Sequence, residues 1–249
     1  MELRGTGVLV TGASSGIGRA IALRLASEGA SVVAHGRDRA RTASVAQLVG
    51  GRAVVADLAT AEGVAALAAE AGAVEVVVAS AGFGWSGPFA EMPGETLEEM
   101  VAVDLSAPML LTHALLPAML GRRRGRIVLV GSVAGRTGVA GEAVYAACKA
   151  ALDGFAESLR LELATTGVGV TVVVPGAVRT AFFARRGRAY DRRFPRPVSA
   201  EQVAEATTAA ILADRDEAWV PQWLRVAPAV RAVTPGLYRR LAARFGERL

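Results

Sequence analysis

A short apolar strand that runs through a glycine-rich turn into a helix is the feature that most restricts how this chain can fold. The apolar run covers residues 7–10, the turn reads Thr11-Gly12-Ala-Ser-Ser-Gly16-Ile-Gly18, and helical spacing of apolar residues continues to Gly29. This order is the first half of a βαβ unit, in which glycines let the backbone approach a pyrophosphate. The helix N-terminus adds free N–H groups and a positive dipole. We therefore expect a dinucleotide site at Gly12, Ser14, Ser15, Gly16, Ile17 and Gly18.

The same alternation of strands and helices continues along the chain. We expect further strands at residues 31–34, 53–56, 75–79, 127–130 and 168–174, and helices between them that include residues 60–71 and 96–120. Strands and helices that alternate at these lengths predict a parallel sheet covered on both faces. With 249 residues, 52% of them hydrophobic, the chain suits a single domain over residues 1–249, of which about 221–249 form a basic amphipathic extension.

Composition excludes several classes of protein. A single cysteine, Cys148, rules out an intrachain disulfide, and no Cys/His cluster indicates a metal site. The chain therefore suits a reducing cytoplasm. Apolar runs are shorter than the roughly 18 residues that a membrane span needs, and the N-terminal run has no secretory pattern. We expect neither a metal nor a membrane-spanning segment.

The carboxyl ends of the predicted strands carry further candidate cofactor contacts. The second strand leads into His35-Gly36-Arg37-Asp38, where a cation suits the 2′-phosphate of NADP and an acid would suit the ribose of NAD. Arg37 therefore favours NADP(H), with NAD(H) as the alternative cofactor. The competing interpretation is that Arg37 is a solvated residue paired with Asp38. We expect Asp57 and Leu58 to flank the adenine, and Ala81 and Gly82 to form a second ligand-binding turn.

Tyr145 and Lys149 lie four residues apart in a helical pattern, so their side chains share one face. An ammonium beside a phenol favours the phenolate, and we expect Lys149 to lower the pKa of Tyr145 toward the range of proton exchange with a substrate. Of the 28 basic residues, Lys149 is the only lysine. A guanidinium cannot replace a compact ammonium, so this exception indicates a specific role. Because the spacing alone is a weak motif, a solvated lysine beside a packed tyrosine is the alternative.

The chain resembles the short-chain dehydrogenase/reductase family from about residue 5 to residue 220. The matching motifs are the Thr11–Gly18 turn, Ala81-Gly82, Ser132 thirteen residues before Tyr145-x-x-x-Lys149, and Pro175-Gly176-x-x-x-Thr180. The resemblance implies a Rossmann-type, doubly wound, mostly parallel seven-stranded sheet with helices on both faces. It also implies that Tyr145 is the general acid/base, that Lys149 lowers its pKa and binds the nicotinamide ribose, and that Ser132 hydrogen-bonds the substrate oxygen. The nicotinamide would then contact Pro175, Gly176, Val178 and Thr180.

The chain departs from the family pattern at two places. The turn after the fourth strand reads Ala79-Ser80-Ala81-Gly82, where the family usually has two asparagines, and this loosens a structural hydrogen-bond network. Asp104 stands where the family usually has an active-site asparagine, whose main-chain carbonyl holds a relay water. An aspartate can keep that role while it adds a charge. The alternative, which we favour at this point, is that the exchange is harmless.

The reaction that the resemblance implies is hydride transfer between a nicotinamide and a carbonyl or secondary alcohol carbon, with Ser132 and Tyr145 polarising the oxygen. Phe83, Trp85, Phe182 and Phe183 are candidates to line an apolar substrate pocket. The competing function is a non-catalytic, NADP-binding regulatory protein or a protein that interacts with a membrane surface. The complete set of Ser132, Tyr145 and Lys149 argues against a non-catalytic role. Family resemblance also implies a homo-oligomer that assembles through residues 96–120 and 142–165.

Basic residues concentrate in two segments, residues 185–196 and 221–249, each with six arginines and one acid. The charges show no nucleic-acid recognition pattern, so we expect no nucleic-acid partner. In the second segment, an arc of about 140° on a helical wheel holds Leu237, Tyr238, Leu241, Ala242, Phe245 and Leu249, with Arg248 intruding, as in a basic amphipathic helix. Packing of this stripe on the domain or on a partner subunit is one interpretation. The other is that both basic segments share one face that approaches an anionic membrane or an acidic carrier protein.

Overall fold

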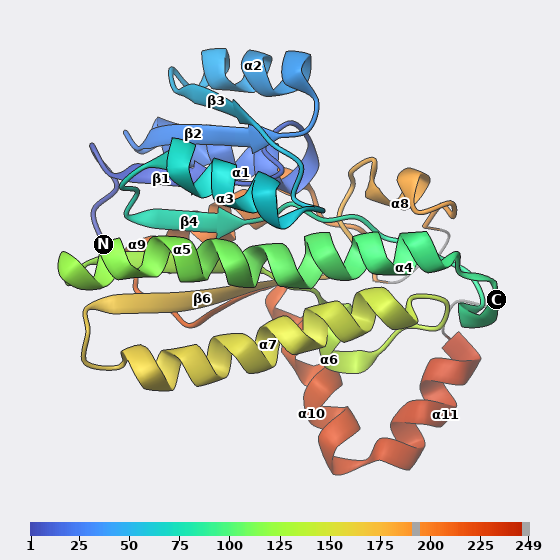
Figure 1. Ribbon diagram of the computed structural model, residues 1–249. Coiled ribbons are helices and arrows are strands. Elements are labelled where there is room, and N and C mark those ends of the chain that lie inside the picture. The colour runs from blue at the N-terminus through green and yellow to red at the C-terminus, as the bar shows by residue number, and fades with distance from the viewer. Residues whose placement is uncertain (191–194, 246–249) are drawn as a thin grey trace.

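A computed structural model describes residues 1–190 and 195–245. Its centre is a sheet of seven parallel strands in the order β3-β2-β1-β4-β5-β6-β7 (Figure 1). The predicted doubly wound α/β sheet is confirmed, and every neighbouring pair is parallel. The strand order reverses between β1 and β4, which is where such sheets bind ligands. The strands are β1 (Gly7–Val10), β2 (Ser31–Gly36), β3 (Arg52–Val55), β4 (Val76–Ala79), β5 (Gly125–Val130), β6 (Val168–Pro175) and β7 (Glu217–Val220).

Helices cover both faces of the sheet because successive strand residues point to opposite sides. Val8 and Val10 of β1 pack in one core with α1 and α9, whereas Leu9 packs in the other core with α3, α5 and α7. The helices are α1 (Gly16–Ser27), α2 (Arg39–Leu48), α3 (Ala61–Ala71), α4 (Gly94–Val101), α5 (Ala107–Gly121), α6 (Val133–Thr137), α7 (Ala143–Leu163), α8 (Phe182–Arg185), α9 (Ala200–Leu212), α10 (Val226–Val233) and α11 (Pro235–Phe245).

The helix predicted at residues 96–120 consists of α4 and α5, joined by a π-helical turn at Ala102–Ser106. Pro108 lies in the first turn of α5, where a missing N–H is tolerated, and the helix continues past Pro117 to Gly121. The continuous stretch of residues 94–121 is long and apolar enough to cross a membrane. Here it packs against α3 and α7, and buried Leu111, Leu115 and Met119 join the core, so it is a core helix of the domain.

The basic segments of the sequence are only partly described. Residues outside the described part include Asp191, Arg192, Arg193, Glu247, Arg248 and Leu249, so their predicted placement is not tested. Figure 1 shows α8 and the α10–α11 hairpin on opposite sides of the molecule in that view, separated by α4 and α7.

Candidate active site

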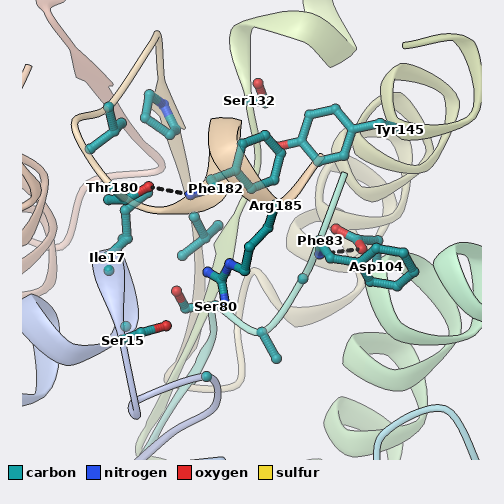
Figure 2. Close-up of a pocket in the computed structure, with 18 of the residues that line it drawn as sticks. Ser15, Ile17, Ser80, Phe83, Asp104, Ser132, Tyr145, Thr180, Phe182 and Arg185 are labelled. Carbon is teal, nitrogen blue, oxygen red and sulfur yellow. Dashed lines mark hydrogen bonds between the residues drawn. The ribbon is translucent and has the colours of Figure 1, made fainter. Parts of the chain in front are cut away.

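A cavity of about 610 Å³ opens at the carboxyl ends of the strands, at the point where the strand order reverses. Figure 2 shows Ser15 and Ile17 of the glycine turn on one side and Tyr145 and Asp104 on the other. The predicted catalytic residues Ser132, Tyr145, Lys149 and Asp104 all line it. So do all the predicted cofactor contacts, namely Gly12, Ser14, Ser15, Gly16, Ile17, Gly18, Arg37, Asp57, Leu58, Ala81, Gly82, Pro175, Gly176, Val178 and Thr180.

The turn between β1 and α1 is shaped so that only glycine fits at two of its positions. Gly12 has φ +67°, and a Cβ there would lie 2.8 Å from the Ala81 Cα. A Cβ at Gly18 would lie 2.5 Å from the Gly12 carbonyl oxygen. These close approaches pack the glycine turn against the β4 turn and against itself, beside the start of α1. The residues therefore fit a bound pyrophosphate.

The turn after β4 is tied to the glycine turn through Thr11. Its hydroxyl oxygen accepts hydrogen bonds from the N–H groups of Ser80 and Ala81, each 3.0 Å long. Thr11 is buried, so these bonds are shielded from water. The two ligand-facing turns are thus held together by the backbone of the β4 turn, although its first residues are alanine and serine.

The end of the cavity at β2 carries two ion pairs. Arg37 Nη1 lies 2.9 Å from Glu99 Oε1, and Arg41 Nε lies 2.7 Å from Asp38 Oδ2. The alternative pairing of Arg37 with Asp38 is therefore wrong. Asp38 instead caps α2 by accepting the Arg41 N–H at 2.9 Å, and hydrogen bonds from the backbone and side chain of Arg41 lower the pKa of Asp38. Because Asp38 caps α2, its carboxylate bonds Arg41 and not the adjacent Arg37.

The catalytic end of the cavity is built by β5, α6 and α7. Ser132 follows β5 and begins α6, where its hydroxyl accepts the Ala134 N–H at 3.1 Å. Tyr145 and Lys149 lie on one face of α7, with Lys149 Nζ 5.5 Å from the Tyr145 ring centroid. A Cβ at Gly135 would lie 2.6 Å from the Lys149 carbonyl carbon, so α6 and α7 touch backbone to backbone. This close approach places Ser132 within hydrogen-bonding reach of the Tyr145 hydroxyl.

Tyr145 has a raised pKa, which corrects the predicted direction. Burial is the largest cause and Asp104 adds to it, whereas the charge of Lys149 and the hydrogen bond with Ser132 lower the pKa. The predicted effect of Lys149 is present, but desolvation of the phenolate outweighs it. Tyr145 is therefore held protonated, as a proton donor requires.

Asp104 lies in the π-helical turn and is completely buried. Its Oδ1 is 2.9 Å from Lys149 Nζ, and its Oδ2 accepts the Phe83 N–H at 3.0 Å. Burial raises the pKa of Asp104, and the charge of Lys149 opposes that rise. For Lys149, burial lowers the pKa, but Asp104 and Tyr145 together raise it above its usual value. The carboxylate of Asp104 thus contacts the Lys149 ammonium directly, and whether the exchange is harmless stays a prediction.

Aromatic side chains form the wall beside Tyr145. The Phe182 ring lies 5.4 Å from the Tyr145 ring and 5.6 Å from the Phe183 ring, and Phe83 also lines the cavity. Trp85, the remaining predicted pocket residue, is not among the described residues that line the large cavity. The Trp85 ring packs close to Gly87 and lines a small adjoining cavity, to which Glu142 and Tyr145 also belong.

Sequence reasoning missed several charged residues of the cavity. Arg41 and Glu99 line it, and Arg185 of α8 points into it toward Ser80 (Figure 2). The position of Arg41 follows from Asp38 as the N-cap of α2, a signal present in the sequence. For Arg185, the neighbouring Arg186 has the same chemistry but is buried against Glu142 and lies 4.7 Å from the Phe183 ring centroid. Only the fold distinguishes these two arginines.

Comparison with known proteins agrees with this geometry. The model of the short chain dehydrogenase family matches residues 6–191. The chain belongs to this family. The 3-oxoacyl-[acyl-carrier-protein] reductase FabG of Escherichia coli strain K12 is 39% identical over 186 residues, which cover 72% of this chain and 76% of that protein.

Two solved structures of the family show the same architecture. A short-chain dehydrogenase from Sphingobium yanoikuyae in complex with NADPH has a TM-score of 0.82 at 28% identity, covering 93% of this chain and 96% of that one. A family member from Burkholderia phymatum in complex with NAD has a TM-score of 0.86 at 25% identity, covering 95% and 96%. Structures similar to this short-chain dehydrogenase therefore bind both forms of the nicotinamide cofactor.

Proposed function

We propose that this short-chain dehydrogenase is an NADP(H)-dependent oxidoreductase that interconverts a carbonyl and a secondary alcohol on an apolar substrate. The observation that carries the proposal is the convergence of Ser132, Tyr145 and Lys149 in the cavity that also contains the glycine turn. A nucleotide-binding protein without turnover has no need of this complete set. Membership of an oxidoreductase family supports the same reaction class.

The residues of this chain supply proton transfer and orientation, and the nicotinamide supplies or accepts the hydride when it is bound. In the reductive direction, Ser132 and Tyr145 donate hydrogen bonds to the substrate carbonyl oxygen, and Tyr145 then gives its proton to the alkoxide that forms. Lys149 stabilises the resulting phenolate through its positive charge. The ion pair with Asp104, at 2.9 Å, holds the Lys149 ammonium at one place beside the phenol.

Preference for NADP(H) over NAD(H) rests on the charges near β2. Both oxygens of Asp38 are engaged by Arg41, at 2.9 Å from its N–H and 2.7 Å from its Nε, so the acid is not directed at a ribose. Arg37 is exposed and pairs with exposed Glu99, and such surface pairs contribute about 0–1 kcal/mol. A 2′-phosphate, with its greater negative charge, can displace Glu99 from Arg37.

The aromatic wall supports an apolar substrate. Phe83, Phe182 and Phe183 surround the face of the cavity next to Tyr145, where the reacting oxygen would lie. FabG of E. coli, the relative named above, is a reductase of 3-oxoacyl groups carried on a protein. We therefore expect 3-oxoacyl thioesters and other apolar ketones to be the first substrates to try.

Features of the described chain support proposals about assembly and location. Leu110 of α5 and Leu161 of α7 are exposed, which supports a homo-oligomer that covers these two helices. The single cysteine is buried, and burial raises the pKa of the Cys148 thiol to about 11, so it is unreactive at neutral pH. These features suit a cytoplasmic enzyme.

The test is a panel of ketones, 3-oxoacyl thioesters, steroids and retinoids, assayed with NADPH and with NADH by the absorbance of the reduced nicotinamide. We expect turnover of at least one apolar carbonyl compound, faster with NADPH. Tight NADPH binding without turnover of any compound would instead favour the non-catalytic, regulatory function.

A further inference from the structure

The α10–α11 hairpin projects away from the sheet at one edge of the molecule (Figure 1). Its two helices join at Thr234, and α10 packs against α6 at its base. Apolar side chains remain in solvent along the hairpin: Val233 near the bend is 81% exposed, and Leu237 of α11 is 53% exposed. Val226 and Leu241 are exposed as well. The stripe predicted from sequence therefore does not pack on the domain at these positions.

One polar side chain of each helix, by contrast, reaches the body of the protein, although Arg231 itself stays exposed. Arg231 Nη1 donates to the Arg136 carbonyl oxygen at 2.7 Å, and the Tyr238 hydroxyl donates to the Thr137 carbonyl oxygen at 3.4 Å. On α10, Arg231 lies about 140° around the helix from Val226, at 100° per residue. Val226 and Val233 therefore lie on the side of α10 away from this contact, where they are exposed and available to a partner.

Charge decides between the candidate partners. Residues 221–245 contain five arginines and no acid, and Arg225, Arg239 and Arg240 are exposed beside the apolar side chains. In a twofold interface between two copies the same patch meets itself, so these cations would face one another without countercharges. Exposed valine and leucine beside arginine match instead a surface that is apolar inside and anionic outside.

The other basic segment, residues 185–196, lies partly outside the described residues, so the expectation of one shared face is not tested and the inference rests on the hairpin alone. Within the described part of that segment, Arg185 points into the cavity (Figure 2) and Arg186 is buried. The hairpin does lie next to the cavity through the Thr137–Glu142 segment. Thr137 accepts the bond from Tyr238, and Val139 and Glu142 line the cavity only a few residues later.

We infer that the α10–α11 hairpin is a peripheral binding surface for anionic lipid, in which Val226, Val233, Leu237 and Leu241 enter the headgroup region and the arginines contact phosphates. Docked in this way, the protein rests on the bilayer by the side that adjoins the cavity wall at Val139. An apolar substrate dissolved in the lipid would then have a short path to Tyr145. Lipid binding itself requires neither cofactor nor turnover.

The experiment is co-sedimentation of the full-length protein with vesicles of phosphatidylcholine alone and of phosphatidylcholine mixed with phosphatidylglycerol. We expect binding to the mixed vesicles at low salt, and weaker binding as ionic strength screens the arginines. Leu237→Asp should weaken binding by roughly 10- to 100-fold, the effect that full burial of one leucine supports. Leu48→Asp on α2 is the matched control, because Leu48 is a helical leucine that is 60% exposed.

A second pair of variants tests the charges. Arg239→Gln with Arg240→Gln should weaken binding to the mixed vesicles by roughly 30-fold, since each arginine near an anionic surface contributes about fivefold. Arg4→Gln with Arg215→Gln removes the same charge from exposed positions elsewhere and should leave binding unchanged. Circular dichroism and NADPH binding check that each variant is folded.

Three results would overturn the inference. The first is absence of binding to the mixed vesicles at low salt. The second is equal loss of binding in Leu237→Asp and Leu48→Asp. The third is a change of oligomeric state in Leu237→Asp, or retention on an acidic carrier protein, without vesicle binding by the unaltered chain, which would assign the hairpin to a protein partner. Because vesicle binding is measured without substrate, failure of the oxidoreductase assay leaves this test intact.

Discussion

Two ion pairs line the same cavity at opposite ends and have the same length, 2.9 Å, but they differ strongly in their exposure to solvent. In the Lys149–Asp104 pair the side chains are 6% and 0% exposed, whereas in the Arg37–Glu99 pair they are 61% and 41% exposed. Water and salt screen the exposed pair, so it contributes about 0–1 kcal/mol. Breaking the buried pair by removal of one partner costs about 3–5 kcal/mol, because a charge is left without compensation.

This difference assigns the pairs different roles. The buried pair cannot exchange its partners for water, so it fixes the position and charge of Lys149 beside Tyr145. The exposed pair opens easily, so Arg37 can leave Glu99 for a more strongly charged group. A fixed Lys149–Asp104 pair suits a site whose reacting groups must stay in place. An Arg37–Glu99 pair that opens easily suits a site whose ligand must enter and leave.

The largest expected effect comes from a change at the buried end that preserves charge and alters shape. Lys149→Arg keeps the positive charge, but the planar guanidinium cannot occupy the position of the ammonium between Asp104 and Tyr145. We expect kcat to fall by about 10²–10⁴-fold, the range that a positioned acid or base contributes. Tyr145→Phe, which loses only the hydroxyl, is the reference for absent proton transfer and should fall at least as far.

Tyr145→Phe should keep the fold and NADPH binding, which circular dichroism and fluorescence titration would show, and circular dichroism would check the fold of Lys149→Arg. Wild-type rates in Lys149→Arg would mean that proton transfer does not depend on the compact ammonium at this position. Substantial activity in Tyr145→Phe would remove Tyr145 from its role as the acid.

The next effect in size concerns the exposed pair. Arg37→Asp replaces a contact to the 2′-phosphate with repulsion, so we expect the KM for NADPH to rise by roughly tenfold or more, the effect of about 1.5 kcal/mol for a hydrogen bond between charged groups. The KM for NADH should change little. Arg39→Asp is the matched control for net charge, because Arg39 lies two residues from Arg37 and is not among the described residues that line the cavity. Equal losses with both nucleotides would show that Arg37 does not contact the phosphate.

A smaller effect is expected when the buried pair loses only its negative charge. Asp104 raises the pKa of Tyr145, since a nearby anion disfavours the phenolate. Asp104→Asn keeps the size and an oxygen for the Phe83 N–H, so the pKa of Tyr145 should fall. The limb of the pH–rate profile that belongs to Tyr145 should then move to lower pH. Asp153→Asn on α7 removes a carboxylate paired with Arg136 instead, and should leave that limb in place.

The profile of kcat/KM against pH distinguishes the two roles of Asp104. A purely structural aspartate would change the height of the profile and the stability of the protein without moving the limb. An unmoved limb in Asp104→Asn would therefore return this residue to a neutral exchange for the family's asparagine.

The smallest expected effect comes from removal of the negative charge of the exposed pair. Glu99→Gln frees Arg37 from its exposed partner, so NADPH should bind slightly more tightly, by less than about 1 kcal/mol or roughly fivefold. NADH binding should not change, because its ribose carries no phosphate for Arg37. Isothermal titration with both nucleotides measures the difference. A loss of NADPH affinity in Glu99→Gln would show that Glu99 positions Arg37 and does not compete with the phosphate.

Much of the site was predictable because its parts are local. Gly12 and Gly18 belong to one turn, and Tyr145 and Lys149 belong to one helix, so backbone geometry over a few residues brings each set together. Placement of Ser132 beside Tyr145 also followed from the family pattern. Prediction of the cavity lining was wrong for Trp85, whose ring packs on Gly87 beside a smaller cavity. Prediction of the direction of the Tyr145 pKa was also wrong, because burial cannot be read from spacing.

By itself, the sequence determined the alternation of strands and helices, the glycine turn and the spacing of the catalytic residues, since each depends on periodicity between near neighbours. Only the tertiary structure decided which charged side chains pair and what each one contacts. Arg37 pairs with Glu99 across 62 positions, Lys149 pairs with Asp104 in a buried π-helical turn, and Arg231 bonds the Arg136 carbonyl oxygen while Leu237 stays in solvent. Such partners depend on how whole helices pack on the sheet, and burial then sets what each pair contributes.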